Sequence, residues 1–362
     1  MRNFNKFVVN IDNLRCNLIL IQRLLGDNVK LCAVVKADAY GVGVETVCKS
    51  IKDIVDFFAV SNVFEAKEIR DLGINTKILI LGVVGVEDVE YCAKNNISIT
   101  VGDFDYLKAI SNNLNSTIQI HLKVNSGLNR YGYKNKNMFR KSVNLINRSK
   151  NMVLEGVYTH FATKKEDVEF INIQKKIFDE YCVYLPKKAI KHCANSFATM
   201  LSSVYQYDMV RIGVNMYGDM RGENLPLKDV VSIESEVVAT TIVQKFQSVG
   251  YDRTYTADKT CKVAVVPLGY ADGINRKASN SFFVLINGKC ANIVGNVCMD
   301  CFMVDITGID NVYIGTKVTI VGESLDKKIT MLDWADNLKT SPYDVLLNFR
   351  KKRFEYVRKI KK

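Results

Sequence analysis

The 362-residue chain lacks several features that would assign it at once to a common protein class. No apolar run reaches the roughly 20 residues that a membrane-spanning helix needs. The N-terminal segment MRNFNKFVVNIDNL has no apolar stretch followed by a cleavage site. We therefore expect a cytoplasmic protein. No low-complexity linker divides the chain, which predicts that its domains pack firmly against each other.

Histidine is scarce, with three residues, whereas cysteine is frequent, with ten. Cys298 and Cys301 form a C-x-x-C pair, but without a second pair and with so few histidines we expect no zinc site. The cysteines are scattered, and several lie inside apolar runs. This pattern is typical of reduced, packed thiols and argues against a disulfide framework.

Motifs for nucleic-acid binding are also missing, although the formal net charge is +12. The basic residues are dispersed except for a C-terminal cluster over 350–353 and 358–362, and no aromatic-interleaved basic motif is present. We interpret the charge as a solvated surface whose positive field favours carboxylate or phosphate ligands.

Short apolar strands alternate with amphipathic segments through residues 1–225. The helical pattern is clearest over 170–184, where apolar residues recur at helical spacing. The eight expected strands are 31–35, 57–61, 77–82, 98–101, 118–124, 153–160, 190–195 and 209–213. This α/β alternation predicts an N-terminal (β/α)8 TIM-type barrel, with a doubly wound parallel sheet as the alternative.

The pattern changes over residues 226–362, where long β-type runs follow one another without helices between them. These runs are 232–246, 261–273, 282–307 and 317–323. The Asn287-Gly288 pair predicts a hairpin turn. Helical patterns return only over 330–338 and 341–352. We expect a second, C-terminal mostly-β domain with a short helical end.

The segment AVVKADAYGVG (33–43) delivers Lys36 to the end of an apolar strand. A lysine in a dry place loses its ammonium form more easily and can form Schiff bases, although most strand-end lysines are solvated. The whole segment resembles the pyridoxal phosphate (PLP) attachment segment of the alanine racemase family. The resemblance implies a PLP-dependent isomerase that interconverts L-alanine and D-alanine, with Lys36 as one of two acid/base groups.

The second acid/base group implied by the resemblance is Tyr251, in VGYDRTYTA (249–257). In the family this tyrosine comes from the neighbouring subunit, which implies a homodimer with shared active sites. Asp252 stands where relatives carry a small residue. A carboxylate that approached the phenol would raise its pKa.

Further cofactor contacts are implied by VRIGVNMYG (210–218), YTHFAT (158–163) and HCANSFAT (192–199). Arg211 resembles the family arginine that faces the pyridine nitrogen, and His160 resembles the histidine that supports it. Because an arginine stays charged, it disfavours a second proton on that nitrogen and so limits transamination. The implied phosphate ligands are Tyr40, Ser196, Tyr356 and the backbone amides of Gly213 and Val214.

Substrate contacts are implied by KVNSGLNRYGY (123–133), NVCMDCFMVD (296–305) and GYADG (269–273). Arg130 and the Met299 amide resemble residues near the substrate carboxylate, and Tyr270 resembles one at the pocket mouth. Lys123 stands where relatives often carry a carbamylated lysine.

Two positions depart from the family pattern. Lys165 stands where relatives have Asp, and Asn296 stands where they usually have Arg. Loss of this ion pair at the mouth leaves open a broader racemase that accepts serine or larger amino acids.

A non-enzymatic PLP-carrying barrel protein would lack the segments around Tyr251 and Tyr270. A PLP decarboxylase would favour a carboxylate where Arg211 stands. D-alanine supply for peptidoglycan is the role that the family implies.

Overall fold

The computed structural model describes residues 3–112, 114–162, 167–219, 225–349 and 351–360. The chain forms two compact units. The barrel unit consists of Leu18–Ala39 and Gly43–Gly213, and the β-rich unit consists of Met1–Asn17, Tyr40–Val42 and Val214–Lys362. The predicted division at 225/226 assigned the N-terminal segment to the barrel, whereas the structure groups it with the β-rich unit because its strand pairs there.

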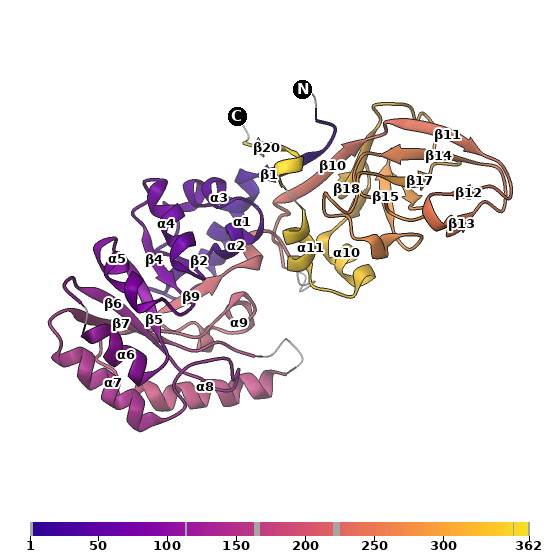
Figure 1. The fold of residues 1–362 in the computed structure, drawn as a ribbon. Coiled ribbons are helices and arrows are strands. Elements are labelled where there is room, and N and C mark those ends of the chain that lie inside the picture. Colours follow the sequence, from indigo (N-terminus) through magenta and orange to yellow (C-terminus); the bar gives the residue numbers. More distant parts are fainter. Residues whose placement is uncertain (1–2, 113, 163–166, 220–224, 350, 361–362) are drawn as a thin grey trace. The chain divides into compact units, whose positions relative to one another are not determined.

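Eight parallel strands form the sheet of the barrel unit (Figure 1). The strands are β2 (Lys30–Val34), β3 (Phe57–Val60), β4 (Lys77–Ile80), β5 (Ile97–Val101), β6 (Ile118–Lys123), β7 (Met152–Tyr158), β8 (Ile190–His192) and β9 (Met209–Ile212). Their order is β8-β7-β6-β5-β4-β3-β2-β9. Each overlaps one of the eight predicted strands.

Two backbone hydrogen bonds join the two outer members of this sheet and close it. Asp208 N donates to Lys191 O and Arg211 N donates to Ala194 O, each over 3.0 Å. Every residue of β3 and β5 is buried, as expected for parallel strands that are covered on both faces. The predicted (β/α)8 barrel is confirmed, and the open doubly wound alternative is wrong.

A helix precedes the first of these strands, and helices follow most of the strands. They are α1 (Ile11–Arg23), α2 (Lys36–Tyr40), α3 (Val44–Ile51), α4 (Val63–Asp71), α5 (Val89–Lys94), α6 (Phe104–Ser111), α7 (Lys136–Arg148), α8 (Val168–Cys182) and α9 (Ser196–Leu201). Asn62, Asp103 and Asn195 accept hydrogen bonds from backbone N–H groups at the starts of α4, α6 and α9. Such caps satisfy donors that have no partner within the helix. In the described parts of the chain, no helix is long and apolar enough to span a bilayer.

The described residues of the β-rich unit form three sheets. The largest has the order β16-β15-β18-β10-β1-β20, with β19 paired to β18. Its strands are β1 (Lys6–Asn10), β10 (Val231–Glu236), β15 (Phe283–Ile286), β16 (Lys289–Asn292), β18 (Lys317–Ser324), β19 (Lys327–Ile329) and β20 (Glu355–Lys359). The smaller sheets comprise β11 (Ala239–Val243), β14 (Cys261–Val266) and β17 (Phe302–Asp305), and β12 (Ser248–Val249) with β13 (Tyr255–Thr256). The predicted mostly-β character is confirmed.

The predicted hairpin at Asn287-Gly288 joins β15 to β16, and both turn residues have positive φ, as a type I′ turn requires. The two C-terminal helices are α10 (Met331–Leu338) and α11 (Pro342–Asn348). The helix expected over 341–352 therefore ends earlier than predicted. The basic C-terminal segment then forms β20, a strand that we did not predict.

Candidate active site

The chain leaves β2 through a left-handed turn that begins at Lys36. Ala37, Asp38 and Ala39 all have φ near 53°, a conformation that costs an L-residue about 1–2 kcal/mol. Hydrogen bonds hold the turn: Ala37 N donates to Glu65 Oε1 over 2.9 Å, and Val44 N donates to Asp38 Oδ1 over 2.7 Å. Strain of this kind is typical of functional sites.

Lys36 itself is exposed in this chain. The position at the end of an apolar strand therefore does not bury Lys36 in the chain as described, although Ala39 in the same turn is fully buried. The amine is therefore open to a ligand.

Arg211 lies on β9 with 3% of its surface exposed. Nη1 donates to His192 Nδ1 over 2.8 Å, and Nη2 donates to the carbonyl oxygens of Thr159 (2.9 Å) and Cys193 (3.1 Å) and to His160 Nδ1 (3.4 Å). Among the residues that the structure describes, none accepts a hydrogen bond from Nε. The guanidinium is thus fixed through its two terminal nitrogens, while one donor remains for another group.

A buried hydrogen-bonded chain continues from Arg211 through the barrel. His192 Nε2 lies 2.8 Å from His121 Nδ1, and His121 Nε2 lies 3.1 Å from Glu155 Oε2. Because His192 Nδ1 must accept from Arg211, its proton is on Nε2, so each imidazole donates toward Glu155. Lys77 Nζ contacts the other carboxylate oxygen over 2.5 Å. The chain holds Arg211 in one orientation.

Burial and neighbouring charges shift the pKa values of three residues around Arg211 and in this hydrogen-bonded chain. Burial, followed by the charge of Arg211, lowers the pKa of His192 well below its usual value. Burial alone would raise the pKa of Glu155, but the hydrogen bonds that its carboxylate accepts, from His121 foremost and then from Lys77 and Ser98, lower it to about 2. Burial and then the charge of Arg211 lower the pKa of His160 to about 3. His160 and His192 are therefore neutral acceptors at neutral pH.

Lys123, at the end of β6, is 2% exposed. Its Nζ lies 3.3 Å from the centroid of the Tyr131 ring. Burial, followed by the charges of Arg130 and Arg211, lowers its pKa to about 7. None of the described carboxylates forms an ion pair with it. Arg130 is exposed, and its guanidinium carbon lies 5.8 Å from the same ring.

The expected phosphate ligands of the barrel unit meet directly. Ser196 is buried at the start of α9, and its Oγ accepts a hydrogen bond from Gly213 N over 3.0 Å. The amide that we expected to face a phosphate therefore has a hydroxyl partner in this structure.

The other expected phosphate ligands belong to the β-rich unit. Val214 begins a short 3-10 helix, η3 (Val214–Met216). Within it, Asn215 is fully buried, and neither polar atom of its side chain has a partner in the described structure. A buried amide without a partner costs about 1–3 kcal/mol, which is a reason to expect a polar ligand or water near this turn.

Two tyrosines expected at the phosphate have different surroundings. The ring centroid of Tyr40 lies 5.9 Å from that of Tyr217, and burial raises the pKa of its phenol. Tyr356 lies on β20, its ring stacks on Phe7 with centroids 5.9 Å apart, and its hydroxyl donates to Val42 O over 2.7 Å. The phosphate contact expected of Tyr356 stays a prediction, since this hydroxyl would have to exchange its present acceptor for a phosphate oxygen, as the Gly213 amide would.

The β-rich unit presents the remaining expected residues at its surface. Tyr251 is 70% exposed, Met299 53% and Tyr270 43%. Backbone contacts join two of them: Tyr270 N donates to Cys298 O, and Ala271 N donates to Met299 O, each over 3.0 Å. A Cβ on Gly269 would lie 2.2 Å from Met299 O, so only glycine permits this approach.

His121, His192 and Glu155 were not among the residues predicted for the site. Two signals were available: the chain has only three histidines, and Glu155 interrupts an apolar strand. Lys165, expected at the pocket mouth, lies outside the described residues.

Comparisons with known proteins give one consistent result. The profile of the alanine racemase N-terminal domain matches residues 9–221, and that of the C-terminal domain matches residues 230–357. Alanine racemase 2 of Caldanaerobacter subterraneus subsp. tengcongensis is 35% identical over 350 residues, covering 93% of this chain and 90% of the relative. The crystal structure of alanine racemase from E. faecalis has a TM-score of 0.94 at 29% identity and covers 99% of this chain and 98% of its own. A histidine racemase from Leuconostoc mesenteroides subsp. sake shares the fold, with a TM-score of 0.88 at 24% identity over 99% of both chains.

Proposed function

The chain belongs to the alanine racemase family of PLP-dependent isomerases, and we propose that Lys36 and Tyr251 are the acid/base groups with which it interconverts L- and D-alanine. The observation that carries the assignment in the barrel unit is the hydrogen bonding of the Arg211 guanidinium. Both terminal nitrogens donate to buried acceptors, while Nε has no acceptor among the described residues.

The residues present fit PLP. When bound, PLP withdraws electrons from the α-carbon of an attached amino acid and so acidifies the α-hydrogen. Lys36 is the proposed attachment point because its amine is exposed at the end of β2. Arg211 Nε is the proposed donor to the ring nitrogen, and its permanent charge keeps that nitrogen free of a proton. Tyr40, Ser196, Tyr356 and the backbone amides of Gly213 and Val214 remain the proposed phosphate ligands.

Racemisation requires that a proton leave one face of the α-carbon and that another arrive on the opposite face. By resemblance to the family, Lys36 Nζ takes the proton from D-alanine and Tyr251 Oη takes it from L-alanine. Lys36 Nζ donates the proton that completes D-alanine when L-alanine is the substrate, and Tyr251 Oη donates the proton that completes L-alanine when D-alanine is the substrate. The exposure of Tyr251 in the single chain supports a homodimer in which this phenol serves the site of a second protomer.

Arg130 and the Met299 amide are the proposed contacts of the substrate carboxylate. Lys123 supports Arg130 in this role if its amine is carbamylated. An amine with a pKa of about 7 is partly neutral near pH 7, and its lone pair can attack carbon dioxide with loss of one N–H proton. The resulting carbamate would replace a positive charge beside Arg130 with a negative one.

A broader substrate range is the second candidate. Asn296 removes a guanidinium that relatives usually carry at the mouth, and a histidine racemase shares the fold. Initial rates on a panel of L-amino acids decide between the two, because a strict alanine racemase turns over serine and histidine far more slowly than alanine.

The cellular role that we propose is D-alanine supply for peptidoglycan by a cytoplasmic homodimer. Chiral chromatography of L-alanine incubated with the protein and PLP tests the activity. Borohydride reduction of the protein–cofactor linkage, followed by peptide mapping, tests the attachment point, with Lys36→Ala as the control. A label on any other lysine would overturn the assignment of Lys36.

A further inference from the structure

Tyr251 lies in a short hairpin whose backbone is unusual. The turn joins β12 to β13 through the 3-10 segment η4 (Tyr251–Arg253). Gly250 has φ 75°, and Asp252 (φ 61°) and Arg253 (φ 52°) follow in the left-handed region, which L-residues with a Cβ adopt rarely. A backbone of this kind persists only where its surroundings hold it.

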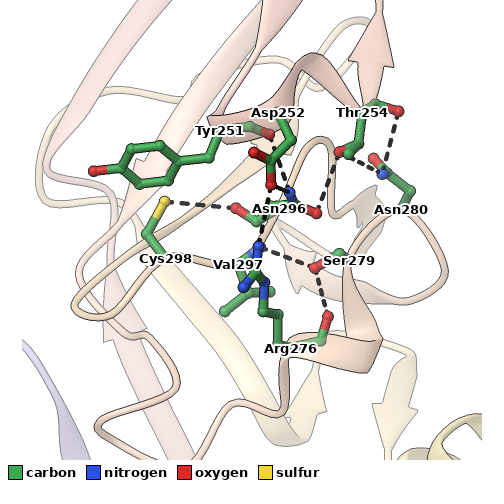
Figure 2. Close-up of polar contacts among 9 residues, drawn as sticks. All are labelled: Tyr251, Asp252, Thr254, Arg276, Ser279, Asn280, Asn296, Val297 and Cys298. Atoms are coloured by element: carbon green, nitrogen blue, oxygen red, sulfur yellow. Dashed lines mark hydrogen bonds and ion pairs between the residues drawn. The ribbon is translucent and has the colours of Figure 1, made fainter.

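The base of this hairpin is anchored in a small apolar core. Val249 and Tyr255 pair across the two strands, and both pack with the cluster around Val263 and Val294. The phenol of Tyr251, in contrast, is largely exposed, and its hydroxyl has no hydrogen-bond partner among the described residues. Figure 2 shows the ring pointing away from the polar residues drawn around it. The position from which the phenol projects is therefore set by the backbone of the turn.

One side chain from another segment holds that backbone. Asn296 Nδ2 donates to Tyr251 O over 3.0 Å and to Asp252 Oδ2 over 2.9 Å (Figure 2). Its Oδ1 accepts from Thr254 Oγ1 over 3.3 Å. Both amide donors and the amide oxygen are thus used, and all three partners lie in the hairpin.

Asn296 is itself held on both sides. Asn280 Oδ1 accepts from Gly295 N over 2.6 Å, and Asn280 Nδ2 donates to Thr254 Oγ1 over 3.1 Å. On the other side, Val297 N donates to Ser279 Oγ over 2.9 Å. These contacts link Thr254 of the hairpin through Asn280 to Gly295, the neighbour of Asn296. The backbone of Asn296 is therefore held in place, and its side chain can hold the hairpin.

Asp252 completes the arrangement. Its carboxylate accepts from Asn296 and from Arg276 Nη2, the latter over 3.2 Å, and it does not turn toward the phenol (Figure 2). The ion pair with Arg276 is more than half exposed on both sides and contributes little by itself. The amide of Asn296 fits this acceptor and the Thr254 hydroxyl together, whereas an arginine at 296 would have no atom to accept from Thr254.

We propose that Asn296 is a positioning residue for Tyr251: it fixes the backbone turn that aims the phenol, and Asp252 is the second acceptor through which it does so. This inference rests on the proposed function, since it requires that Tyr251 exchange a proton with substrate. It relates two departures from the family pattern to each other, because the carboxylate of Asp252 accepts a hydrogen bond from the amide of Asn296.

The test compares two rates in Asn296→Asp, a variant that keeps the side-chain shape, removes both donors and places a carboxylate against Asp252. Racemisation needs Tyr251, whereas exchange of the α-hydrogen of D-alanine with D₂O needs only Lys36. We expect kcat/KM for racemisation to fall about tenfold or more, since misplacement of a catalytic group by about 1 Å costs up to 100-fold. Exchange from D-alanine should fall less than twofold. Asn292→Asp, an exposed asparagine on β16, is the matched control and should change neither rate.

Further variants keep the test decisive. Asp252→Gly in the Asn296→Asp background removes the like-charge pair and should recover part of the racemisation rate. If Asn296→Asp does not fold, as judged by circular dichroism, Asn296→Ala replaces it, with the same split between the two rates expected.

The results that would overturn the role of Asn296 differ from those that would overturn the proposed function. Unchanged racemisation, or racemisation and exchange that fall together, overturns the role of Asn296. A wild-type chain that neither racemises nor exchanges alanine overturns the proposed function instead, as does a Tyr251→Phe variant with full racemase activity.

Discussion

Lowering the pH from 8 to 5 should leave the imidazoles of His160 and His192 uncharged. An ordinary histidine gains its proton near pH 6.5. Burial, and then the charge of Arg211, lowers the pKa of His160 to about 3 and that of His192 well below its usual value. Protonation of His192 would also remove the acceptor that Arg211 Nη1 now uses.

Because the folded chain keeps these two imidazoles neutral, its free energy of unfolding should fall in acid. In the unfolded chain His160 and His192 each bind a proton as the pH falls through 6.5, while in the folded chain His160 binds one only near pH 3. The unfolded state is therefore favoured increasingly below pH 6.5, and the free energy of unfolding falls. For His160, pH 5 lies 1.5 pH units below the unfolded pKa, which corresponds to about 2 kcal/mol, and the lowered pKa of His192 adds to the loss in the same direction.

Because the chain has only three histidines, a ¹H–¹³C NMR titration of their Cε1–H groups can resolve each one. Single substitutions assign the signals, with His160→Asn identifying one directly. We expect the signals of His160 and His192 to stay constant between pH 8 and 5 while urea unfolding shows the loss in stability. A titration of either signal near pH 6.5 would refute the argument from burial and from the charge of Arg211.

Three further predictions concern other groups. Lys123→Ala should raise KM for alanine, and bicarbonate should lower KM for the unsubstituted chain alone; equal bicarbonate responses in both would contradict carbamylation. Glu155→Gln keeps the side-chain shape but removes the charge that His121 and Lys77 contact, so urea unfolding should show a loss of about 1–3 kcal/mol in stability. Unchanged stability would show that the hydrogen bonds from Arg211 to Glu155 contribute nothing to it. Asn296→Arg should narrow the substrate panel toward alanine if the mouth sets selectivity, whereas an unchanged ratio of serine to alanine rates would place selectivity elsewhere.

The barrel was predictable because its strands are buried on both faces and therefore form short apolar runs. β1 and β20 were not, since each pairs with a strand far away in the sequence: Lys6 lies opposite Glu355 and Glu234. Nothing local marks EYVRK as a strand. The same long-range pairing places Tyr356 beside Phe7 and Val42, which spacing along the chain could not reveal.

Site residues could be predicted where they stand in a recognisable sequence motif. They could not be predicted where their role depends on which way a strand faces. Lys36, Tyr251 and Arg211 stand in long recognisable segments. His121 and Glu155 lie within strands, and whether they face one another depends on the pleat and on a register shift between β6 and β7. The hydrogen bonds of Asn296 likewise depend on a turn geometry that the sequence does not encode in any short pattern.

The central claim is that an amine and a phenol serve opposite faces of one substrate carbon, and hydrogen exchange in Tyr251→Phe tests it most directly. Both enantiomers of alanine are incubated with this variant and PLP in D₂O, and α-deuterium and configuration are measured. We predict that D-alanine gains deuterium through Lys36 with its configuration retained, while L-alanine gains none. Deuterium uptake from both enantiomers at similar rates, with inversion, would contradict the account.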